Sequence, residues 1–153
     1  MTTIVWDGKT LASDRATFQG NVVVAERCKI ARRTSDGALI GSCGDTCLGA
    51  ALMRWFLNGE NGERPGLGDD KNNAEAIIAR ADGSVELHFF TGWYEPAGVV
   101  ALGAGKEFAL GAIDAGAGAA DAVRFATLRV GGNTEKIDTL DLHPQSIARL
   151  VST

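Results

Sequence analysis

Cysteine and histidine are scarce in this chain of 153 residues, which has three cysteines and two histidines. An odd number of cysteines (Cys28, Cys43 and Cys47) leaves no complete disulfide framework within one chain. Because His88 and His143 lie far from the cysteines in sequence, we expect no zinc site, no other metal and no cofactor. Free thiols are typical of a reducing compartment, so the cysteine content favours a cytoplasmic protein.

Long apolar runs and an excess of positive charge are also missing. No stretch approaches the about 18 consecutive apolar residues of a transmembrane helix. The start of the chain has no basic segment followed by an apolar core, the pattern of a secretory signal. Fifteen Lys and Arg against 19 Asp and Glu give a net charge of −4, which disfavours a basic surface that binds nucleic-acid phosphates. We therefore expect neither membrane nor nucleic acid as a partner.

Proline is rare, with three residues, whereas glycine is abundant. The 20 glycines make up about 13% of the chain, against an average near 7%. With 45% hydrophobic residues, this composition is typical of a folded domain with many tight turns rather than of a disordered chain. The length predicts a single domain over residues 1–153, in which 143–153 form a C-terminal tail.

Short apolar segments separated by turns dominate the first third of the chain. Asp7-Gly8 and Asp36-Gly37 are typical turns of two-residue β-hairpins. We expect four or five short strands that together form one antiparallel sheet. The expected strands are 2–6, 9–14, 21–25, 28–34 and 38–43.

Helical spacing begins after this segment. Asp45 is a suitable N-cap for a helix with apolar residues from Leu48 to Phe56, and Asn58-Gly59 ends it. Beyond a polar loop at 61–73, the pattern predicts a hairpin, a strand, a helical hairpin and a last strand. The expected ranges are 74–81, 84–90, 99–102, 106–115, 120–128 and 137–142. This order predicts an α+β fold with helices covering two stacked sheets.

Several patterns that resemble binding motifs are interpreted as structural. Gly103-x-Gly105 lacks the third glycine of a dinucleotide loop, so a strand-to-helix turn is expected. The aromatic residues at 93–94 have no basic field around them, which favours core or loop packing over base stacking. Arg32-Arg33 is interpreted as a solvated strand end, and His88 as a structural histidine with satisfied hydrogen bonds.

Thr2 is the first candidate for catalysis. Removal of Met1 would expose a threonine with both a hydroxyl and a free α-amine. An α-amine has an ordinary pKa of about 7.7–8.0, so it accepts a proton at neutral pH far more readily than lysine. A hydroxyl nucleophile needs such a base beside it, and a threonine paired with its own amine is a known solution.

Three further residues fit this chemistry. Lys29 begins a later strand, and its ammonium beside Thr2 would keep the α-amine unprotonated and orient the hydroxyl. Asp14 ends the strand that pairs back on the first one, where it could hold the lysine charged and in place. Gly44 lies between a strand and a helix start, where a backbone N–H suits a developing oxyanion.

At these positions the sequence resembles proteasome β-subunits and HslV-type peptidases, which are N-terminal-nucleophile threonine hydrolases. Nucleophile, acid, lysine and oxyanion glycine occur in the family's order and at similar separations, and the likeness covers most of the chain. The matching stretches are Thr2-Thr3-Ile4-Val5, Ala12-Ser13-Asp14-Arg15, Cys28-Lys29-Ile30, Ile40-Gly41-Ser42-Cys43-Gly44-Asp45, Leu102-Gly103-Ala104-Gly105 and Ile137-Asp138-Thr139-Leu140.

The resemblance implies a four-layer αββα sandwich, with two antiparallel sheets between helix layers. It implies hydrolysis of peptides or unfolded proteins through a Thr2 acyl-enzyme, with Lys29 tuning the nucleophile, Asp14 supporting it and Gly44 binding the oxyanion. It also implies a homo-oligomeric ring that encloses the active sites and is fed by a separate ATP-driven unfoldase.

Two departures from the family pattern leave alternatives open. Ala104 stands where the family commonly has serine, and the supporting Asp and Ser of the last loop are missing. Depending on the alignment, those positions hold Val130 and Asn133 or Thr127 and Val130. A catalytically inactive ring or scaffold subunit is one alternative, which a retained Met1 would favour. A relative that hydrolyses non-peptide amides is the other.

Overall fold

The computed structural model describes residues 2–143, so the expected removal of Met1 and the expected tail beyond His143 lie outside the described residues. The first of two large sheets is antiparallel throughout. In spatial order its strands are β10 (Val100–Gly103), β1 (Thr3–Trp6), β2 (Thr10–Ser13) and β11 (Asp138–Asp141). The Asp7-Gly8 turn joins β1 to β2, which confirms the first predicted hairpin.

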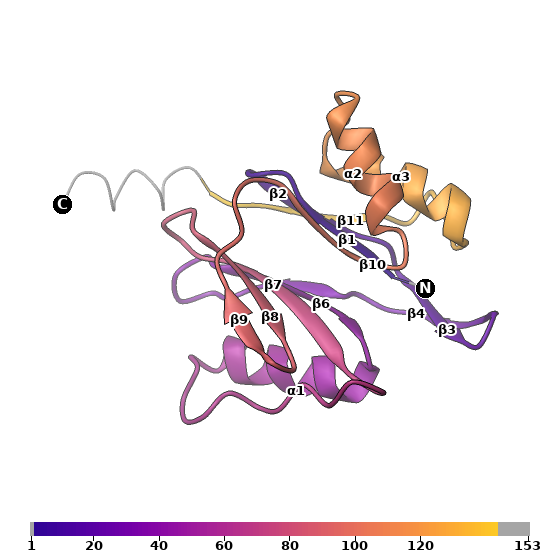
Figure 1. Cartoon of the computed structure of the whole chain (residues 1–153). Coiled ribbons are helices and arrows are strands. Elements are labelled where there is room, and N and C mark those ends of the chain that lie inside the picture. Colours follow the sequence, from indigo (N-terminus) through magenta and orange to yellow (C-terminus); the bar gives the residue numbers. More distant parts are fainter. Residues whose placement is uncertain (1, 144–153) are drawn as a thin grey trace.

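The second sheet is also antiparallel and contains the middle of the chain. Its strands are β5 (Ile30–Arg32), β6 (Leu39–Gly44), β7 (Ala74–Ala79), β8 (Val85–Phe89) and β9 (Gly92–Tyr94). A separate hairpin of β3 (Ala16–Gln19) and β4 (Val22–Glu26) connects the two sheets in sequence. It projects from the right-hand side of the molecule in Figure 1.

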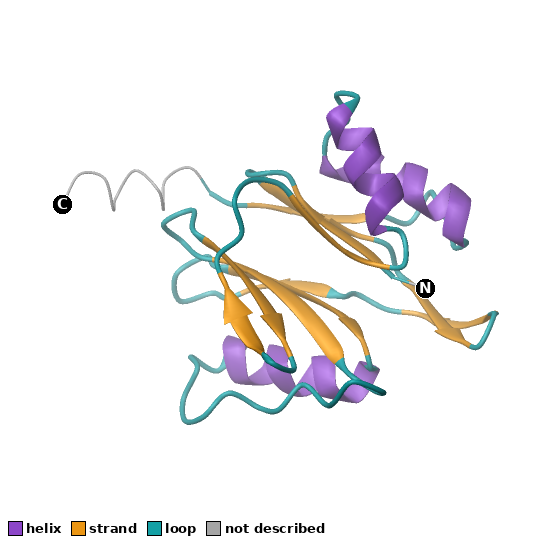
Figure 2. Cartoon of the chain, in the orientation of Figure 1, coloured by secondary structure: helices purple, strands orange, loops and turns teal. Residues whose placement is uncertain are grey.

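Three helices in the described part of the chain cover the outer faces of the sheets. Helix α1 (Thr46–Leu57) packs on the second sheet, and the hairpin of α2 (Lys106–Asp114) and α3 (Ala119–Val130) packs on the first. Figures 1 and 2 show the resulting order of helices, sheet, sheet and helix. The α+β fold and the four-layer αββα sandwich expected from the sequence are therefore confirmed.

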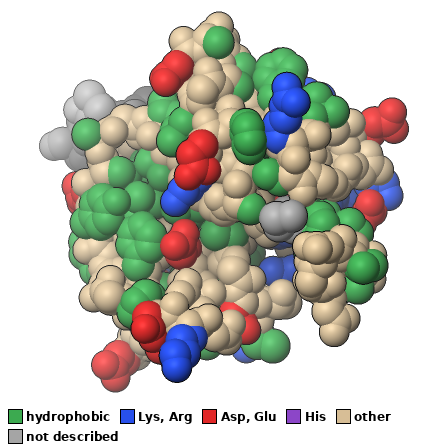
Figure 3. All heavy atoms as spheres, turned by 45° about the vertical axis from the view of Figure 1, so that its right-hand side comes forward, with side chains coloured by type: hydrophobic (Ala, Val, Ile, Leu, Met, Phe, Trp, Pro, Cys, Tyr) green, Lys and Arg blue, Asp and Glu red, His purple; other side chains and the backbone are tan. Residues whose placement is uncertain are grey.

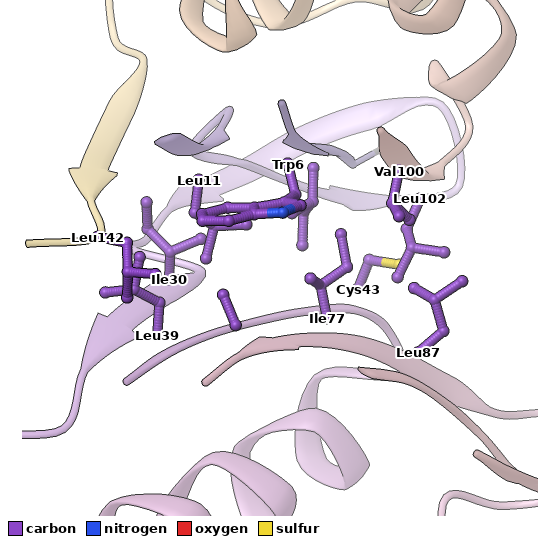
Figure 4. Close-up of a cluster of buried hydrophobic side chains, with 12 residues drawn as sticks. Trp6, Leu11, Ile30, Leu39, Cys43, Ile77, Leu87, Val100, Leu102 and Leu142 are labelled. Atoms are coloured by element: carbon purple, nitrogen blue, oxygen red, sulfur yellow. The ribbon is translucent and has the colours of Figure 1, made fainter. Parts of the chain in front are cut away.

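The alternation of side chains along β1 explains why both of its faces are buried. Ile4 and Trp6 point into the space between the sheets, whereas Val5 points toward α2 and α3. Figure 4 shows apolar side chains of the two sheets facing one another in this central core. Small residues such as Ala122 and Ala126 dominate beneath α3, which brings that helix close to the sheet.

The expectation that the first five strands form one sheet is wrong. The chain leaves the first sheet after Asp14, forms the β3–β4 hairpin, and enters the second sheet at β5. Strand β3 was not predicted from the sequence, and Asn21, expected as the first residue of a strand, instead forms with Gly20 the turn between β3 and β4. Hairpin signals are local, so they identify neighbouring strands without deciding which sheet each pair joins.

Two interpretations of surface and core residues also need correction. Arg33 is buried rather than solvated: its guanidinium pairs with Asp36 and Glu60, both at 2.8 Å, and lies 4.3 Å from the ring centre of Phe56. The aromatic residues at 93–94 form part of the edge strand β9, and both are about half exposed, rather than packed in a core or loop. Strand β9 is only three residues long, too short for a periodic pattern.

Candidate active site

A cavity of about 450 Å³ opens where the start of β1, the segment before β5 and the end of β6 come together. Thr2, Lys29 and Gly44 all line it, and Asp14 lies directly behind Lys29. In Figure 3 the surface is hollowed beside the projecting hairpin, and Lys or Arg side chains are visible within the hollow. The tertiary structure thus brings the four residues singled out in the sequence to one place.

The backbone around Thr2 is held by a close approach between β1 and β10. Thr3 pairs with Gly103 in the antiparallel register, and Gly103 has a positive φ of +94°. A Cβ on Gly103 would lie 2.0 Å from the Thr2 carbonyl oxygen, so only glycine allows this approach. The strand-to-helix turn predicted at Gly103-x-Gly105 is confirmed, and it positions residue 2 at the cavity.

Lys29 is the centre of the hydrogen-bond arrangement. Its ammonium donates to Thr2 Oγ1 at 2.9 Å, to both Asp14 carboxylate oxygens at 3.1 Å, and to the Ala16 carbonyl at 2.6 Å. The Asp14 carboxylate is itself oriented by the backbone N–H of Thr3 at 2.9 Å and of Ala16 at 3.2 Å. The lysine can therefore turn a proton toward the Thr2 hydroxyl without losing its counter-ion.

Burial sets the electrostatics of this pair. The side chains of Lys29 and Asp14 are each 2% exposed. Burial lowers the pKa of Lys29 below its ordinary value, although the attraction of Asp14 acts in the opposite direction. The positive charge of Arg27 also lowers it. A buried ion pair of this kind is strongly destabilised when one partner is removed, because the other charge is left uncompensated.

Gly44 is the last residue of β6 in the second sheet, two residues before α1 begins. It has a φ of +89°, and a Cβ there would lie 2.4 Å from the Asn73 carbonyl oxygen, so the position requires glycine. Asp45 caps α1 as predicted, accepting a hydrogen bond from the Leu48 N–H at 2.9 Å. The role of Gly44 as an oxyanion donor stays a prediction, and its place at the cavity fits that role.

Other lining residues were not identified from the sequence. Arg27, Glu75 and Lys106 are charged groups of the lining, and no spacing signal pointed to them because they come from three separate segments. Cys43 also lines the cavity, and burial raises the pKa of its thiol to about 12, so it stays protonated at neutral pH and is a poor nucleophile. Of Cys43 and Thr2, Thr2 is therefore the better candidate for the nucleophile.

The departures from the family pattern are also visible here. Ala104 lines the cavity and brings no hydroxyl to it. Thr127 donates its hydroxyl to the Val123 carbonyl within α3 at 2.8 Å, so this hydroxyl is occupied away from Thr2. The interpretation of His88 as structural fits its contacts: it is buried, with Nε2 2.9 Å from Glu86 and Nδ1 3.0 Å from Arg64.

Within residues 2–143, no three His, Cys, Asp or Glu side chains gather closely enough to hold a metal ion. In the same part of the chain, every helix is too short or too polar to cross a membrane.

Solved structures with the same architecture were found by structural comparison. Eukaryotic HslV from Trypanosoma brucei is similar with a TM-score of 0.69 and 26% identity, covering 92% of this chain and 98% of its own. BPH from Thiobacillus denitrificans, a bacterial proteasome homologue, is similar in complex with epoxomicin (TM-score 0.60, 18% identity, 94% of this chain, 99% of its own). A second structure of BPH gives a TM-score of 0.59, 19% identity and coverage of 94% and 98%.

No protein-family model matches the chain, and a search of curated proteins finds no match. The fold is nevertheless clear from the coverage and TM-scores. The chain has the HslV/proteasome-type N-terminal-nucleophile hydrolase fold, as the resemblance in sequence predicted.

Proposed function

We propose that the protein is a threonine peptidase in which Thr2, once Met1 is removed, is both nucleophile and base. The observation that carries this proposal is the hydrogen bond of 2.9 Å from the buried Lys29 ammonium to Thr2 Oγ1, at the wall of an open cavity. A lysine that is merely structural would be satisfied by Asp14 and the Ala16 carbonyl. Its additional bond to the hydroxyl supports a role in activating that oxygen.

The proposed reaction follows from these contacts. The free α-amine of Thr2 takes the hydroxyl proton, and Oγ1 attacks the substrate carbonyl. The nearby Lys29 ammonium disfavours a second positive charge, so it keeps the α-amine unprotonated before the attack. The Gly44 N–H donates to the tetrahedral oxyanion. The α-ammonium then protonates the leaving amine, and water, deprotonated by the same amine, hydrolyses the ester.

A catalytically inactive ring subunit is the second candidate, because Ala104 brings no hydroxyl to the cavity. The two candidates predict different results with an electrophile. We expect epoxomicin, the compound bound in one of the BPH structures, to add one equivalent to the N-terminal residue of this protein. Intact mass spectrometry measures both the adduct and the loss of Met1, and peptide mapping locates it.

An unlabelled protein that retains Met1 would contradict the peptidase and support the inactive subunit. Hydrolysis of other amides but not of peptides would support the non-peptide amide hydrolase. The proposed substrates are peptides or unfolded proteins, delivered in the cytoplasm by an ATP-driven unfoldase.

We further propose that the chain assembles as a homo-oligomeric ring. The outer surface of α2 and α3 carries exposed apolar side chains, among them Phe125 at 50% and Leu128 at 67% exposure, spaced three residues apart on one helix face. Exposed apolar groups in such a cluster are typical of contact surfaces between proteins.

Native mass spectrometry is therefore expected to find a multi-subunit assembly. The double variant Phe125→Ser/Leu128→Ser should shift it toward monomer, whereas Phe90→Ser, at an exposed position of the second sheet's β8–β9 turn, should not. A wild-type protein that is monomeric over the tested concentrations would overturn the assembly proposal and leave the chemistry at Thr2 untouched.

A further inference from the structure

We propose that the cavity selects peptides with an acidic side chain at the residue preceding the scissile bond, and that Arg27 is the specificity-determining residue. This inference rests on the proposed peptidase function and assigns a substrate class to the same cavity.

Arg27 is a cation without a counter-ion. It lines the cavity and is half-buried, and its Nε is buried without a hydrogen-bond partner among residues 2–143. Within the same residues no carboxylate lies within ion-pair distance of its guanidinium. Burying part of a charged group without a partner costs free energy, which a carboxylate arriving from solution would recover. The structure therefore presents an incomplete ion pair at the cavity wall.

The position of Arg27 places this carboxylate next to the reacting atoms. Arg27 lies two residues before Lys29, and both side chains line the cavity. Its backbone N–H donates to the Arg15 carbonyl at 2.8 Å, which holds this segment against the strand region that follows Asp14. The charge of Arg27 acts on Lys29, whose ammonium holds the Thr2 hydroxyl. Because Arg27 and Thr2 line the same cavity, we infer that the substrate side chain that reaches Arg27 belongs to a residue next to the attacked carbonyl.

The remaining charges of the lining favour an acidic group as well. The charge of Lys29 is balanced by Asp14, with which it forms a buried ion pair. Arg27, Lys106 and Glu75 also line the cavity, and none of them forms an ion pair with another of the residues 2–143. Two cations against one carboxylate leave the unpaired groups of the described lining with a net positive charge, in a chain whose net charge is −4. The local field therefore has the opposite sign to the whole molecule and attracts anions.

The test compares coumarin amides of otherwise identical peptides that end in Glu, Gln, Leu or Arg. Glu and Gln have nearly the same shape, so their ratio of kcat/KM isolates the charge. We expect the wild type to prefer Glu over Gln by about ten- to one-hundredfold, the range of a charge-assisted hydrogen bond. Arg27→Gln should reduce this ratio to about one, while Arg54→Gln, which removes the same charge from an exposed position of α1, should preserve it.

Two further measurements keep the inference falsifiable. Arg27→Glu should reverse the preference toward the Arg substrate, and added salt should lower the Glu-to-Gln ratio of the wild type. A wild type that is labelled at Thr2 by epoxomicin, yet cleaves Gln or Leu substrates as well as Glu, would overturn the acidic preference and leave the proposed function standing. If the wild type is neither labelled nor active on any substrate, the proposed function fails and the inference falls with it.

Discussion

Thr2→Ala is expected to abolish amide hydrolysis, with kcat falling by on the order of 10⁶-fold, as is found when a catalytic nucleophile is removed. The variant still has an α-amine at residue 2, but no oxygen to which the Lys29 ammonium can donate. Steady-state hydrolysis of a fluorogenic peptide measures the loss. Covalent labelling by epoxomicin should disappear in parallel, because the attacking atom is absent.

Two matched variants serve as controls for this result. Thr2→Ser retains the hydroxyl and should keep substantial activity and labelling. Thr139→Ala removes the same atoms from an exposed position on β11 and should leave both unchanged. Labelling or hydrolysis that persists in Thr2→Ala would place the nucleophile at another residue and contradict the proposed mechanism.

Lys29→Met is expected to cause two separate losses. Activity should fall at least about 1,000-fold, because no neighbouring cation then orients the Thr2 hydroxyl or keeps the Thr2 amine unprotonated. The free energy of unfolding should also fall by about 3–5 kcal/mol, because the Asp14 carboxylate stays buried without its counter-ion. Urea unfolding followed by tryptophan fluorescence measures the second effect, since Trp6 lies in the central core.

The double variant Asp14→Asn/Lys29→Met separates these two effects. Removing both charges should restore a large part of the stability lost in Lys29→Met, because a buried uncompensated charge is no longer present. Activity should remain lost, because the ammonium at Thr2 is still missing. A double variant that recovers activity together with stability would show that Lys29 acts only as a structural partner of Asp14.

Local features of the fold were predictable from the sequence because their causes are local. The Asp7-Gly8 hairpin turn, the Asp45 cap of α1 and the Gly103-x-Gly105 turn each depend on residues that are neighbours in the chain. The α+β order followed from these elements. The likeness of short motifs to the HslV and proteasome families then predicted the four layers, which the structure confirms.

Features that depend on distant partners were predicted less well. Arg33 was expected in solvent, since nothing nearby in sequence showed that Glu60 and the ring of Phe56 would enclose it. Strand β9 is defined by its pairing with β8 rather than by a pattern of its own. The lining residues Arg27 and Lys106 lacked any motif, because a cavity wall collects side chains from segments with no fixed separation.

Residue types and their order were enough to name Thr2, Asp14, Lys29 and Gly44 as candidates, because each chemical role admits few side chains. Their convergence depended on how two sheets stack, since β1 and β6 belong to different sheets and the segment that carries Lys29 passes from one to the other. Burial of the Lys29–Asp14 pair and the unpaired charge of Arg27 arise only in that packed arrangement. The lowered pKa of Lys29 and the orientation of its ammonium depend on the groups around it, and these come from segments far apart in the chain.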